Sequence, residues 1–352
     1  MRPRIGNAGQ FDEDALRVLL STRGPFRTTN PYVVQLADSI RNSGVSVQYF
    51  SWRGALFGHY DVLHIHWPEV MIRRDGALAR IAARVRFMML MVRLQLTGTP
   101  IVRTAHNVQA HETGSRTETW LLRWCDRRTR TWIVLNESST VPAGCDRVLI
   151  PHGDYTDWFA GYPKSDPAAG HIVSFGLIRP YKGTELLLES FSHITTVGAR
   201  LRIVGKPSTD ELRAVVESAA EVDVRISAVL DYVPDGTLAL EITAAQLVVL
   251  PYQNMHNSGA LLLALSLERP VLVPGTDVTR TLADEVGLGW VHLYQGSLTS
   301  AALDAALAAP APARSPDLSA RKWPQLGRAH IAVYRDVKRK TRRPRGDQRR
   351  PS

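Results

Sequence analysis

Short apolar runs alternate along the chain with longer segments whose apolar residues recur at helical spacing. Such runs are typical of buried strands, and the longer segments are typical of helices that cover a sheet. The first series of predicted strands comprises residues 18–20, 45–50, 62–66, 101–104, 132–135 and 147–150. The second series comprises residues 172–175, 200–204, 224–227, 247–250, 271–274 and 290–293. Because alternating strands and helices form parallel sheets, the pattern predicts an α/β protein with two doubly wound sheets.

Turn-forming residues separate the two series. Residues 151–154, Pro-His-Gly-Asp, are followed by a loop from Gly161 to Gly170 that contains two prolines, and together they predict a linker. We therefore expect an amino-terminal Rossmann-like domain over residues 1–155 and a carboxy-terminal one over residues 156–330. Residues 331–352 are expected to hold the end of a terminal helix and a basic, disordered tail. Ligands of doubly wound sheets bind at the carboxyl ends of the strands, so we expect the functional residues to face an interdomain cleft.

Composition fits this class of protein. A chain of 352 residues, 44% hydrophobic and 22% charged, is typical of two globular domains. The two cysteines, Cys125 and Cys145, lack the spacing of a disulfide framework or a zinc knuckle, which fits a reducing compartment. The sequence contains no apolar run of about 18 residues, the length that would span a membrane, and shows no secretory signal pattern at its start. These features predict a cytoplasmic location.

The segment HIVSFGLIRPYKG, residues 171–183, predicts a phosphate clamp. An apolar strand runs into Gly176, and Arg179, Lys182 and Gly183 follow within one turn before a helix. Glycine lets the backbone approach a ligand, and a helix start points free amides outward. Two cations at this place suit a nucleotide-sugar diphosphate, whose negative charge grows as it leaves. The alternative is a strand-to-helix turn with two solvated cations.

A second helix start follows the strand at residues 247–250. The candidate donor-binding residues here are Tyr252, Asn257, Ser258 and Gly259. Their position between a buried strand and an apolar helix predicts a second group of amides that accepts an anion. Ser258 is also a good N-cap, and that role is compatible with a phosphate contact.

Titratable residues gather after two strands of the first series. His66, Trp67 and Glu69 end the first of these strands, and the second is followed by His106, Asn107, His111 and Glu112. Imidazole and carboxylate groups at strand ends are candidates for acid–base chemistry. His64 lies on the same side of its strand as His66 and is expected to be buried in the core. The spacing of His106 and His111 is poor for one helical face, so we expect no metal site.

Two smaller features complete the candidate acceptor region. Trp67 suits stacking on a sugar ring, although aromatic residues at strand ends more often serve packing. Ser21, Thr28 and Asn30 lie in the loop after the first predicted strand and are weaker candidates for acceptor contacts.

The net charge of +10 has two main sources. Residues 335–350 hold nine Lys or Arg and two Asp, in a segment with little to pack, which predicts a solvated tail. Residues 76–96 hold four arginines among apolar residues at helical spacing, which predicts a cationic amphipathic helix. This helix either covers a sheet or docks on a membrane surface, and both hold if one face packs while the arginines face lipid.

Three segments, FGLIRPYKG, LRIVGKP and PYQNMHNSGALLLALSLERPVLVP, resemble the nucleotide-sugar domain of GT-B glycosyltransferases. The runs LQLTGTPIVRTAHN, LLRWCDRRTR, RISAVLDYV, ADEVGLGWVHLYQG and PDLSARKWPQLG extend the resemblance over residues 17–335. They are similar to the GDP-mannose:glycolipid 4-β-D-mannosyltransferases of the xanthan gum pathway, which serve exopolysaccharide synthesis. The resemblance implies a GT-B fold with two Rossmann-like domains.

The resemblance also implies an activity: transfer of mannose from GDP-mannose to a polyprenyl-diphosphate-linked oligosaccharide in a β-1,4 linkage. GDP-mannose is an α-donor, so a β-product requires inversion by a single displacement and a general base on the acceptor hydroxyl. Glu69 and His106 are the alternatives for the base, with His111 and Glu112 positioning the acceptor. Acceptor contacts are expected from His66, Trp67, Asn30 and Asn107. No metal or other cofactor is expected.

One departure from the family pattern concerns the donor site. Many relatives carry two glutamates eight positions apart near the ribose and the donor sugar, whereas the matching positions here are Met255 and Leu263. The loop with Asp231 and Tyr232 therefore becomes the candidate for the guanosine end.

Several functions remain open at this stage. The runner-up is a related transferase with another nucleotide-sugar donor, since discrimination between sugars depends on contacts that the pattern does not reveal. A catalytically silent, membrane-associated assembly protein is a second alternative. A basic nucleic-acid-binding protein is a third, but it leaves the phosphate clamp unexplained, so no nucleic-acid partner is expected. The lipid-linked acceptor predicts peripheral contact with an anionic membrane surface at the inner face of the cell membrane, through the basic helix or the tail.

Overall fold

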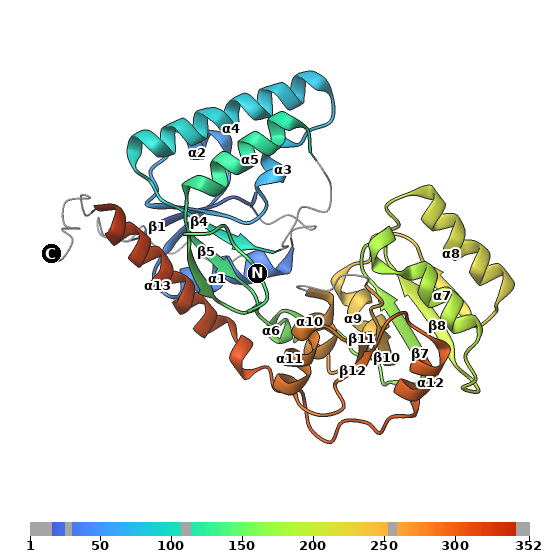
Figure 1. Ribbon diagram of the computed structural model, residues 1–352. Coiled ribbons are helices and arrows are strands. Elements are labelled where there is room, and N and C mark those ends of the chain that lie inside the picture. Colours follow the sequence, from blue (N-terminus) through green and yellow to red (C-terminus); the bar gives the residue numbers. More distant parts are fainter. Residues whose placement is uncertain (1–15, 25–29, 107–113, 253–258, 343–352) are drawn as a thin grey trace, which may run out of the picture. The chain divides into compact units, whose positions relative to one another are not determined.

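The computed structural model describes residues 16–24, 30–106, 114–252 and 259–342 of the chain (Figure 1). The contacts within it divide the chain into two compact units. The first unit holds the described residues up to Leu135, together with Thr140–Ile150 and the described residues from Pro324 onward. The second unit holds Asn136–Ser139 and Pro151–Trp323. In its described residues, each unit contains one six-stranded sheet whose neighbouring strands are all parallel.

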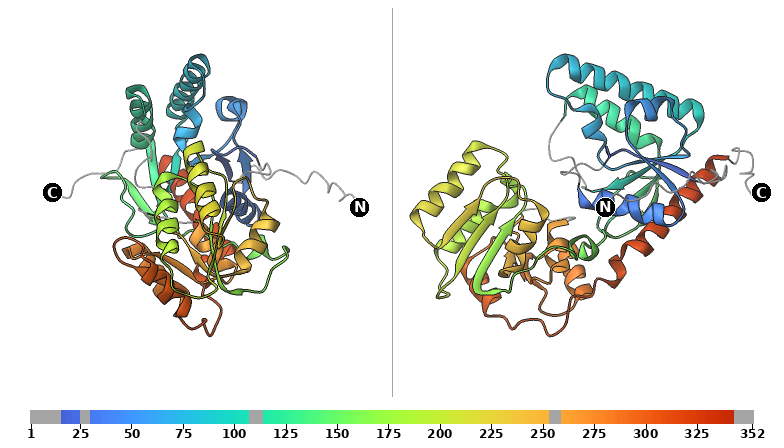
Figure 2. Two further views of the ribbon diagram at one scale, coloured as in Figure 1. Left: turned by 90° about the vertical axis from the view of Figure 1, so that its right-hand side faces the viewer. Right: turned by 180° about the vertical axis from the view of Figure 1, so that it is seen from behind.

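The first unit is a doubly wound α/β fold with the strand order β2-β1-β3-β4-β5-β6. Its elements are β1 (Arg17–Leu20), α1 (Pro31–Asn42), β2 (Ser46–Tyr49), α2 (Trp52–Phe57), β3 (Val62–Ile65), α3 (Pro68–Ile72), α4 (Ala77–Thr97), β4 (Ile101–Ala105), α5 (Arg116–Arg128), β5 (Thr129–Val134), β6 (Asp146–Leu149) and α13 (Trp323–Arg342). Helices α2 to α5 cover one face of the sheet, and α1 and α13 cover the other (Figures 1 and 2). Both faces of the central strands are therefore buried, as their continuous apolar runs predict.

The second unit is also doubly wound and has the strand order β12-β11-β10-β7-β8-β9. Its elements are α6 (Thr156–Phe159), β7 (Ala168–Phe175), the 3₁₀ turn η1 (Pro180–Lys182), α7 (Thr184–Ser192), β8 (Arg200–Val204), α8 (Asp210–Val222), β9 (Ile226–Val229), α9 (Asp235–Thr243), β10 (Ala245–Val249), α10 (Gly259–Ser266), β11 (Val271–Pro274), α11 (Asp277–Val286), β12 (Val291–Tyr294), α12 (Ser300–Ala308) and η2 (Ser319–Arg321). One core packs α6, α9, α10 and α11 on the sheet, and another packs α7, α8 and α12 on its opposite face.

Each sheet has a point where the strand order changes direction. In the first unit this point lies between β1 and β3, and in the second it lies between β7 and β10. The connections that leave the carboxyl ends of these strands turn to opposite faces of the sheet and leave a crevice there, which is where doubly wound folds bind ligands. Among the candidate residues, His66 follows β3 and His106 follows the adjacent β4. In the second unit, Lys182 follows β7 and Tyr252 follows β10. The fold thus places both groups of candidates at the expected edge of their own sheet.

The two predicted series of strands are confirmed, because each predicted run overlaps one of the strands of the structure. The bounds differ where hydrogen bonding to a neighbouring strand continues beyond the apolar residues. For example, β5 begins at Thr129 and β7 at Ala168, several residues before the apolar runs that predicted them.

The carboxy-terminal segment differs from its expectation. Helix α13 continues to Arg342 and belongs from Pro324 onward to the first unit. Tyr334 and Val337 are buried, and Lys338 forms an ion pair of 2.9 Å with Asp61. The expectation that the residues from 335 onward have little to pack was therefore wrong as far as residue 342. Residues 343–352 lie outside the described part of the chain.

The predicted linker at residues 151–154 is also packed. The indole of Trp323 donates to the backbone oxygen of Asp154 over 2.7 Å, and the Asp154 amide donates to the backbone oxygen of Arg321. A side chain at Gly153 would meet the Trp323 ring at 2.4 Å, so only glycine fits there. This segment is a fixed part of the second unit.

Candidate functional site

The residues predicted to form a phosphate clamp lie at the carboxyl end of β7. The strand ends at Phe175, and Gly176 turns the chain with a φ of +95°. Its missing side chain leaves room for the ammonium of Lys182, which lies 3.3 Å from the place of a Cβ atom. Only a residue that tolerates positive φ allows this approach at low cost.

Gly183 ends the turn and begins the following helix. Its φ is +69°, and a Cβ atom there would lie 2.2 Å from the backbone oxygen of Pro251, just after β10. The connection after β7 therefore presses against the chain that leaves β10, at the point where the strand order changes direction. The amides at the start of α7 lie beside Arg179 and Lys182, so cations and a helix start occupy one place, as the sequence predicts.

Lys182 is a half-buried cation with a lowered pKa. Burial, together with the nearby charge of Arg179, lowers its pKa from the usual 10.5 to about 8. Its ammonium lies 4.8 Å above the ring of Tyr252, which is a cation–π contact. The Tyr252 hydroxyl is buried without a hydrogen-bond partner among the described residues, and burial raises its pKa. Arg179 and Lys182 thus place two positive charges beside the start of α7, which favours the binding of an anion.

The start of α10 brings in two residues that the sequence did not single out. A Cβ atom at Gly259 would lie 3.0 Å from the Tyr155 hydroxyl and 3.6 Å from Nε2 of His152. His152 is 8% exposed, burial lowers its pKa to about 4, and its Nδ1 is bonded to the Gly153 oxygen over 2.8 Å. It is therefore a neutral imidazole at pH 7. The turn-rich pattern of residues 151–154 predicted a linker. It did not indicate that His152 lies beside the start of α10.

Three expectations for the donor side have different outcomes. Asn257 and Ser258, like Met255, lie outside the described residues. Leu263 packs against the core of the second unit. Asp231 and Tyr232 follow β9, and the Asp231 carboxylate accepts a hydrogen bond from the Tyr232 amide, while the Tyr232 side chain is 52% exposed.

In the first unit, β3 and β4 bring together His66, Trp67 and His106. Nδ1 of His66 and Nε2 of His106 are hydrogen-bonded over 2.9 Å. The ring of Trp67 stacks on His106 with centroids 4.3 Å apart, so the sugar-stacking face expected of this indole is covered on one side. Tyr32, at the start of α1, packs edge-on against His106 at 5.3 Å. The strand ends thus converge as the sequence predicts, and Tyr32 is an additional member that the pattern did not reveal.

His66 itself is 2% exposed, and its ring contacts other rings rather than the surface. Burial, together with the charge of His330, lowers its pKa to about 3. Nε2 of His66 is buried without a hydrogen-bond partner among the described residues. A neutral imidazole has one N–H and one lone pair, so His66 either donates to His106 or accepts from it.

His64 has the buried role that was expected. It is fully buried, and its two ring nitrogens bond to the hydroxyls of Tyr334 at 2.7 Å and Thr104 at 2.8 Å. Burial lowers its pKa well below the usual value. Because Tyr334 belongs to α13, this histidine ties the terminal helix to the centre of the first sheet.

Glu69 lies in the first turn of α3 and is partly exposed. Its charge interacts with Arg103 of β4, which stacks on Trp132 and pairs with Asp126.

Asn30 caps α1 by accepting a hydrogen bond of 3.0 Å from the Tyr32 amide. Capping of α1 is a structural role, and it accounts for Asn30 without any contact to an acceptor substrate. Asn107, His111 and Glu112, together with Thr28, lie outside the described residues.

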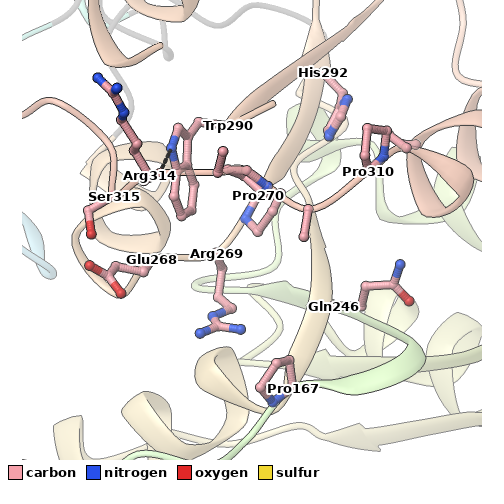
Figure 3. A pocket seen from close by; sticks show the side chains of 15 residues that line it. Pro167, Gln246, Glu268, Arg269, Pro270, Trp290, His292, Pro310, Arg314 and Ser315 are labelled. Atoms are coloured by element: carbon pink, nitrogen blue, oxygen red, sulfur yellow. Dashed lines mark hydrogen bonds between the residues drawn. The ribbon is translucent and has the colours of Figure 1, made fainter. Parts of the chain in front are cut away.

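A pocket of about 410 Å³ opens at the amino-terminal ends of strands of the second sheet (Figure 3). Three of its lining residues directly precede strands: Pro167 before β7, Pro270 before β11 and Trp290 before β12. Trp290 is held there by a hydrogen bond of 2.9 Å to the backbone oxygen of Arg314. Because doubly wound sheets bind ligands at the carboxyl ends of their strands, this pocket is distinct from the predicted phosphate clamp. Within the described residues, no group of three His, Cys, Asp or Glu side chains is arranged to hold a metal ion.

Comparisons with known proteins relate the chain to glycosyltransferases. The family described as "Glycosyl transferases group 1" matches residues 169–306. Two curated relatives from Xanthomonas campestris pv. campestris, each named "GDP-mannose:glycolipid 4-beta-D-mannosyltransferase", are 48% and 47% identical over 324 residues, which is 91% of this chain and 92% of each relative.

Solved structures show the same fold. Sucrose-phosphate synthase from Thermosynechococcus elongatus has a TM-score of 0.64 at 16% identity and covers 92% of this chain and 99% of its own. HepE of Anabaena, solved in complex with UDP and glucose, has a TM-score of 0.56 at 13% identity and covers 92% of this chain and 98% of its own. The fold is therefore GT-B, as expected.

Proposed function

Because the chain belongs to the glycosyltransferase family of the GDP-mannose:glycolipid 4-β-D-mannosyltransferases, we propose that it transfers mannose from GDP-mannose to a lipid-linked oligosaccharide. The product would carry a β-1,4 linkage, formed with inversion at the anomeric carbon. The observation that carries the proposal is the half-buried pair of cations, Arg179 and Lys182, at the start of α7. The acceptor is a polyprenyl-diphosphate-linked oligosaccharide.

The donor binds by its diphosphate. Arg179 and Lys182 donate charge-assisted hydrogen bonds to phosphate oxygens, and the helix start adds its own positive end. An anion beside Lys182 stabilises the charged ammonium, so binding of the donor raises the pKa of this group above 8. The negative charge on GDP increases as the glycosidic bond breaks, so the same contacts strengthen in the transition state and speed departure.

The acceptor hydroxyl loses its proton to a base in the first unit. For His106, the tautomer that donates Nε2–H to His66 leaves Nδ1 as the nitrogen that takes the proton. His66 then stabilises the charged ring through the lone pair of its Nδ1, and its own low pKa keeps it neutral. For Glu69, the carboxylate takes the proton directly, and the charge of Arg103 lies nearby. Both assignments give inversion by one displacement.

The test measures donor choice and product configuration together. Purified protein is supplied with a lipid-linked acceptor and, in separate reactions, GDP-mannose, GDP-glucose and UDP-glucose. We expect transfer from GDP-mannose and a new signal of a β-mannoside in the NMR spectrum of the released oligosaccharide. Transfer from GDP-glucose or UDP-glucose instead of GDP-mannose would contradict the assigned donor. An α-linked product would contradict inversion. Transfer from none of the three donors would contradict the proposal as a whole.

A further inference from the structure

Helix α4 has two apolar faces. Ala83, Phe87, Leu90, Met91 and Leu94 are buried in the core of the first unit. Six other apolar residues of the helix are exposed: Leu78 (84%), Ile81 (58%), Val85 (42%), Met89 (47%), Val92 (47%) and Leu96 (82%). The face that covers the sheet is therefore a different face from the one that these exposed residues form.

The exposed residues form a continuous stripe, here called the α4 stripe. At 100° per residue, the six side chains fall within an arc of about 80°, on the side of the helix opposite the buried residues. The stripe is about 27 Å long, because it extends over five turns. Single exposed apolar residues are ordinary, but a contiguous row of this length marks a surface that contacts something else.

Arginines accompany the stripe. Helix α4 contains Arg80, Arg84, Arg86 and Arg93 and no acidic residue. No helix in the described part of the chain is long and apolar enough to cross a membrane. A helix with an apolar stripe and a polar side rich in arginine lies in the plane of a membrane surface.

A pocket of about 630 Å³ opens at the amino-terminal end of this helix. It is lined by Arg73, Arg74, Asp75, Arg80, Arg84, Gly114, Ser115 and Glu118, four arginines against two acidic residues. Arg73 pairs with Glu118 over 2.8 Å, and Arg84 donates to the Ser115 hydroxyl over 2.9 Å. Nε of Arg84 is buried without a hydrogen-bond partner among the described residues, so the pocket has donor capacity that these residues do not use.

We propose that the α4 stripe and this arginine pocket together dock the first unit on an anionic phospholipid bilayer. The stripe enters the boundary between headgroups and acyl chains, and the pocket binds a headgroup phosphate. Guanidinium groups suit this ligand because they donate paired hydrogen bonds to phosphate oxygens. The proposal deepens the proposed function, on which it rests for its purpose, since a glycolipid acceptor stays in a bilayer.

The surface continues into the candidate acceptor region. Helix α3, which carries Glu69 in its first turn, ends where the pocket begins, and the Arg73 amide donates to the Glu69 backbone oxygen over 2.9 Å. Val70 of the same helix is 60% exposed. Docking in this way brings the residues after β3 close to the headgroup layer, where the sugar of a lipid-linked acceptor lies.

The charge pattern favours a bilayer over a second copy of the chain. A symmetric pair of α4 helices would bring eight guanidinium groups into one interface, and α4 offers no carboxylate to neutralise them. Anionic lipids supply that negative charge. A second copy remains an outcome of the test.

The experiment is co-sedimentation of the full-length protein with vesicles of phosphatidylcholine, with and without 30% phosphatidylglycerol, in the absence of any sugar nucleotide. We expect binding only to the anionic vesicles, weakened by salt. Arg80→Ala/Arg84→Ala should weaken binding by about fivefold for each arginine removed, and Ile81→Ser/Val85→Ser by about tenfold or more. The substituted residues are exposed or partly exposed, so circular dichroism melting should show an intact fold.

Matched controls separate this surface from general effects. Val222→Ser/Val224→Ser removes two apolar side chains that are 86% and 95% exposed in the second unit and should leave binding unchanged. Deletion of residues 343–352 tests the basic carboxy-terminal segment instead. The proposal is overturned if the two α4 variants bind like the unsubstituted protein, or if the deletion alone abolishes binding. It is also overturned if sedimentation velocity shows a dimer that only the α4 variants dissociate, while vesicle binding persists.

The same variants distinguish this proposal from the proposed function. Vesicle binding is measured without substrates, so it stands or falls independently of catalysis. GDP-mannose affinity, measured by calorimetry, should be unchanged in the Ile81→Ser/Val85→Ser variant. Loss of vesicle binding with normal donor affinity supports the docking surface, whereas normal vesicle binding in a protein without donor affinity contradicts only the proposed function.

Discussion

Replacing Lys182 by methionine should make the ligand-free protein more stable and the donor complex weaker. In the folded protein, burial and Arg179 lower the pKa of Lys182 from 10.5 to about 8. Below pH 8 the lysine is charged in both the folded and the unfolded chain, so the folded state carries the full cost of holding the charge. Above pH 10.5 the lysine is neutral in both states and the cost vanishes.

The magnitude follows from the size of this shift. A fall in pKa from 10.5 to about 8 corresponds to about 3 kcal/mol, and partial exposure of the side chain reduces this to about 2 kcal/mol. Methionine has a similar length and no charge, so Lys182→Met should raise the melting temperature of the ligand-free protein at pH 7 by about 5 °C. The gain should shrink as the pH rises from 8 towards 10.5.

Donor binding should change in the opposite direction. A charge-assisted hydrogen bond contributes about 1.5 to 3 kcal/mol, so the Kd for GDP-mannose should rise by about 10-fold to 100-fold. The assays are differential scanning fluorimetry across pH and isothermal titration calorimetry with GDP-mannose. Lys164→Met, which removes an exposed lysine of the same unit, should leave both quantities unchanged. A Lys182→Met protein that melts lower than the unsubstituted protein at pH 7, or binds the donor equally well, would refute the reasoning.

Two further predictions concern the base and the turn. Glu69→Gln and His106→Ala separate the two candidates: the true base should lower kcat by about 100-fold or more with little change in donor Kd, and normal turnover in both variants excludes both assignments. Gly183→Ala places a Cβ atom 2.2 Å from the Pro251 oxygen at a φ of +69° and should cost more than about 2 kcal/mol in the free energy of unfolding. Gly198→Ala is its control, because φ there is +78° but no heavy atom lies within 4 Å; equal losses in chemical denaturation would contradict the steric argument.

The sequence predicted the fold because each sheet is built from local signals. Apolar runs with helical segments between them define parallel sheets, and the ends of those runs define the edge where ligands bind. The convergence of His66 with His106 and of Gly176 with Lys182 follows from that rule alone.

The sequence failed where long-range packing decides the outcome. Periodicity identified α4 as a helix, but with apolar residues on two faces it did not reveal which face meets the sheet. The contact of Gly183 with the Pro251 backbone joins segments 68 positions apart, and the packing of α13 on the first unit joins the two ends of the chain. Charge alone predicted a solvated tail there, whereas the buried side chains of Tyr334 and Val337 hold the helix in place.

The most direct measurement is transfer of radiolabelled mannose from GDP-mannose into a lipid-extractable product, with lipid-linked oligosaccharide from a strain blocked at this step. The predicted result is label in the lipid fraction with the unsubstituted protein and strongly reduced label with Lys182→Met at subsaturating donor. The Xanthomonas campestris relative serves as a positive control for the acceptor preparation. Label transferred by the relative but not by this protein would contradict the central claim.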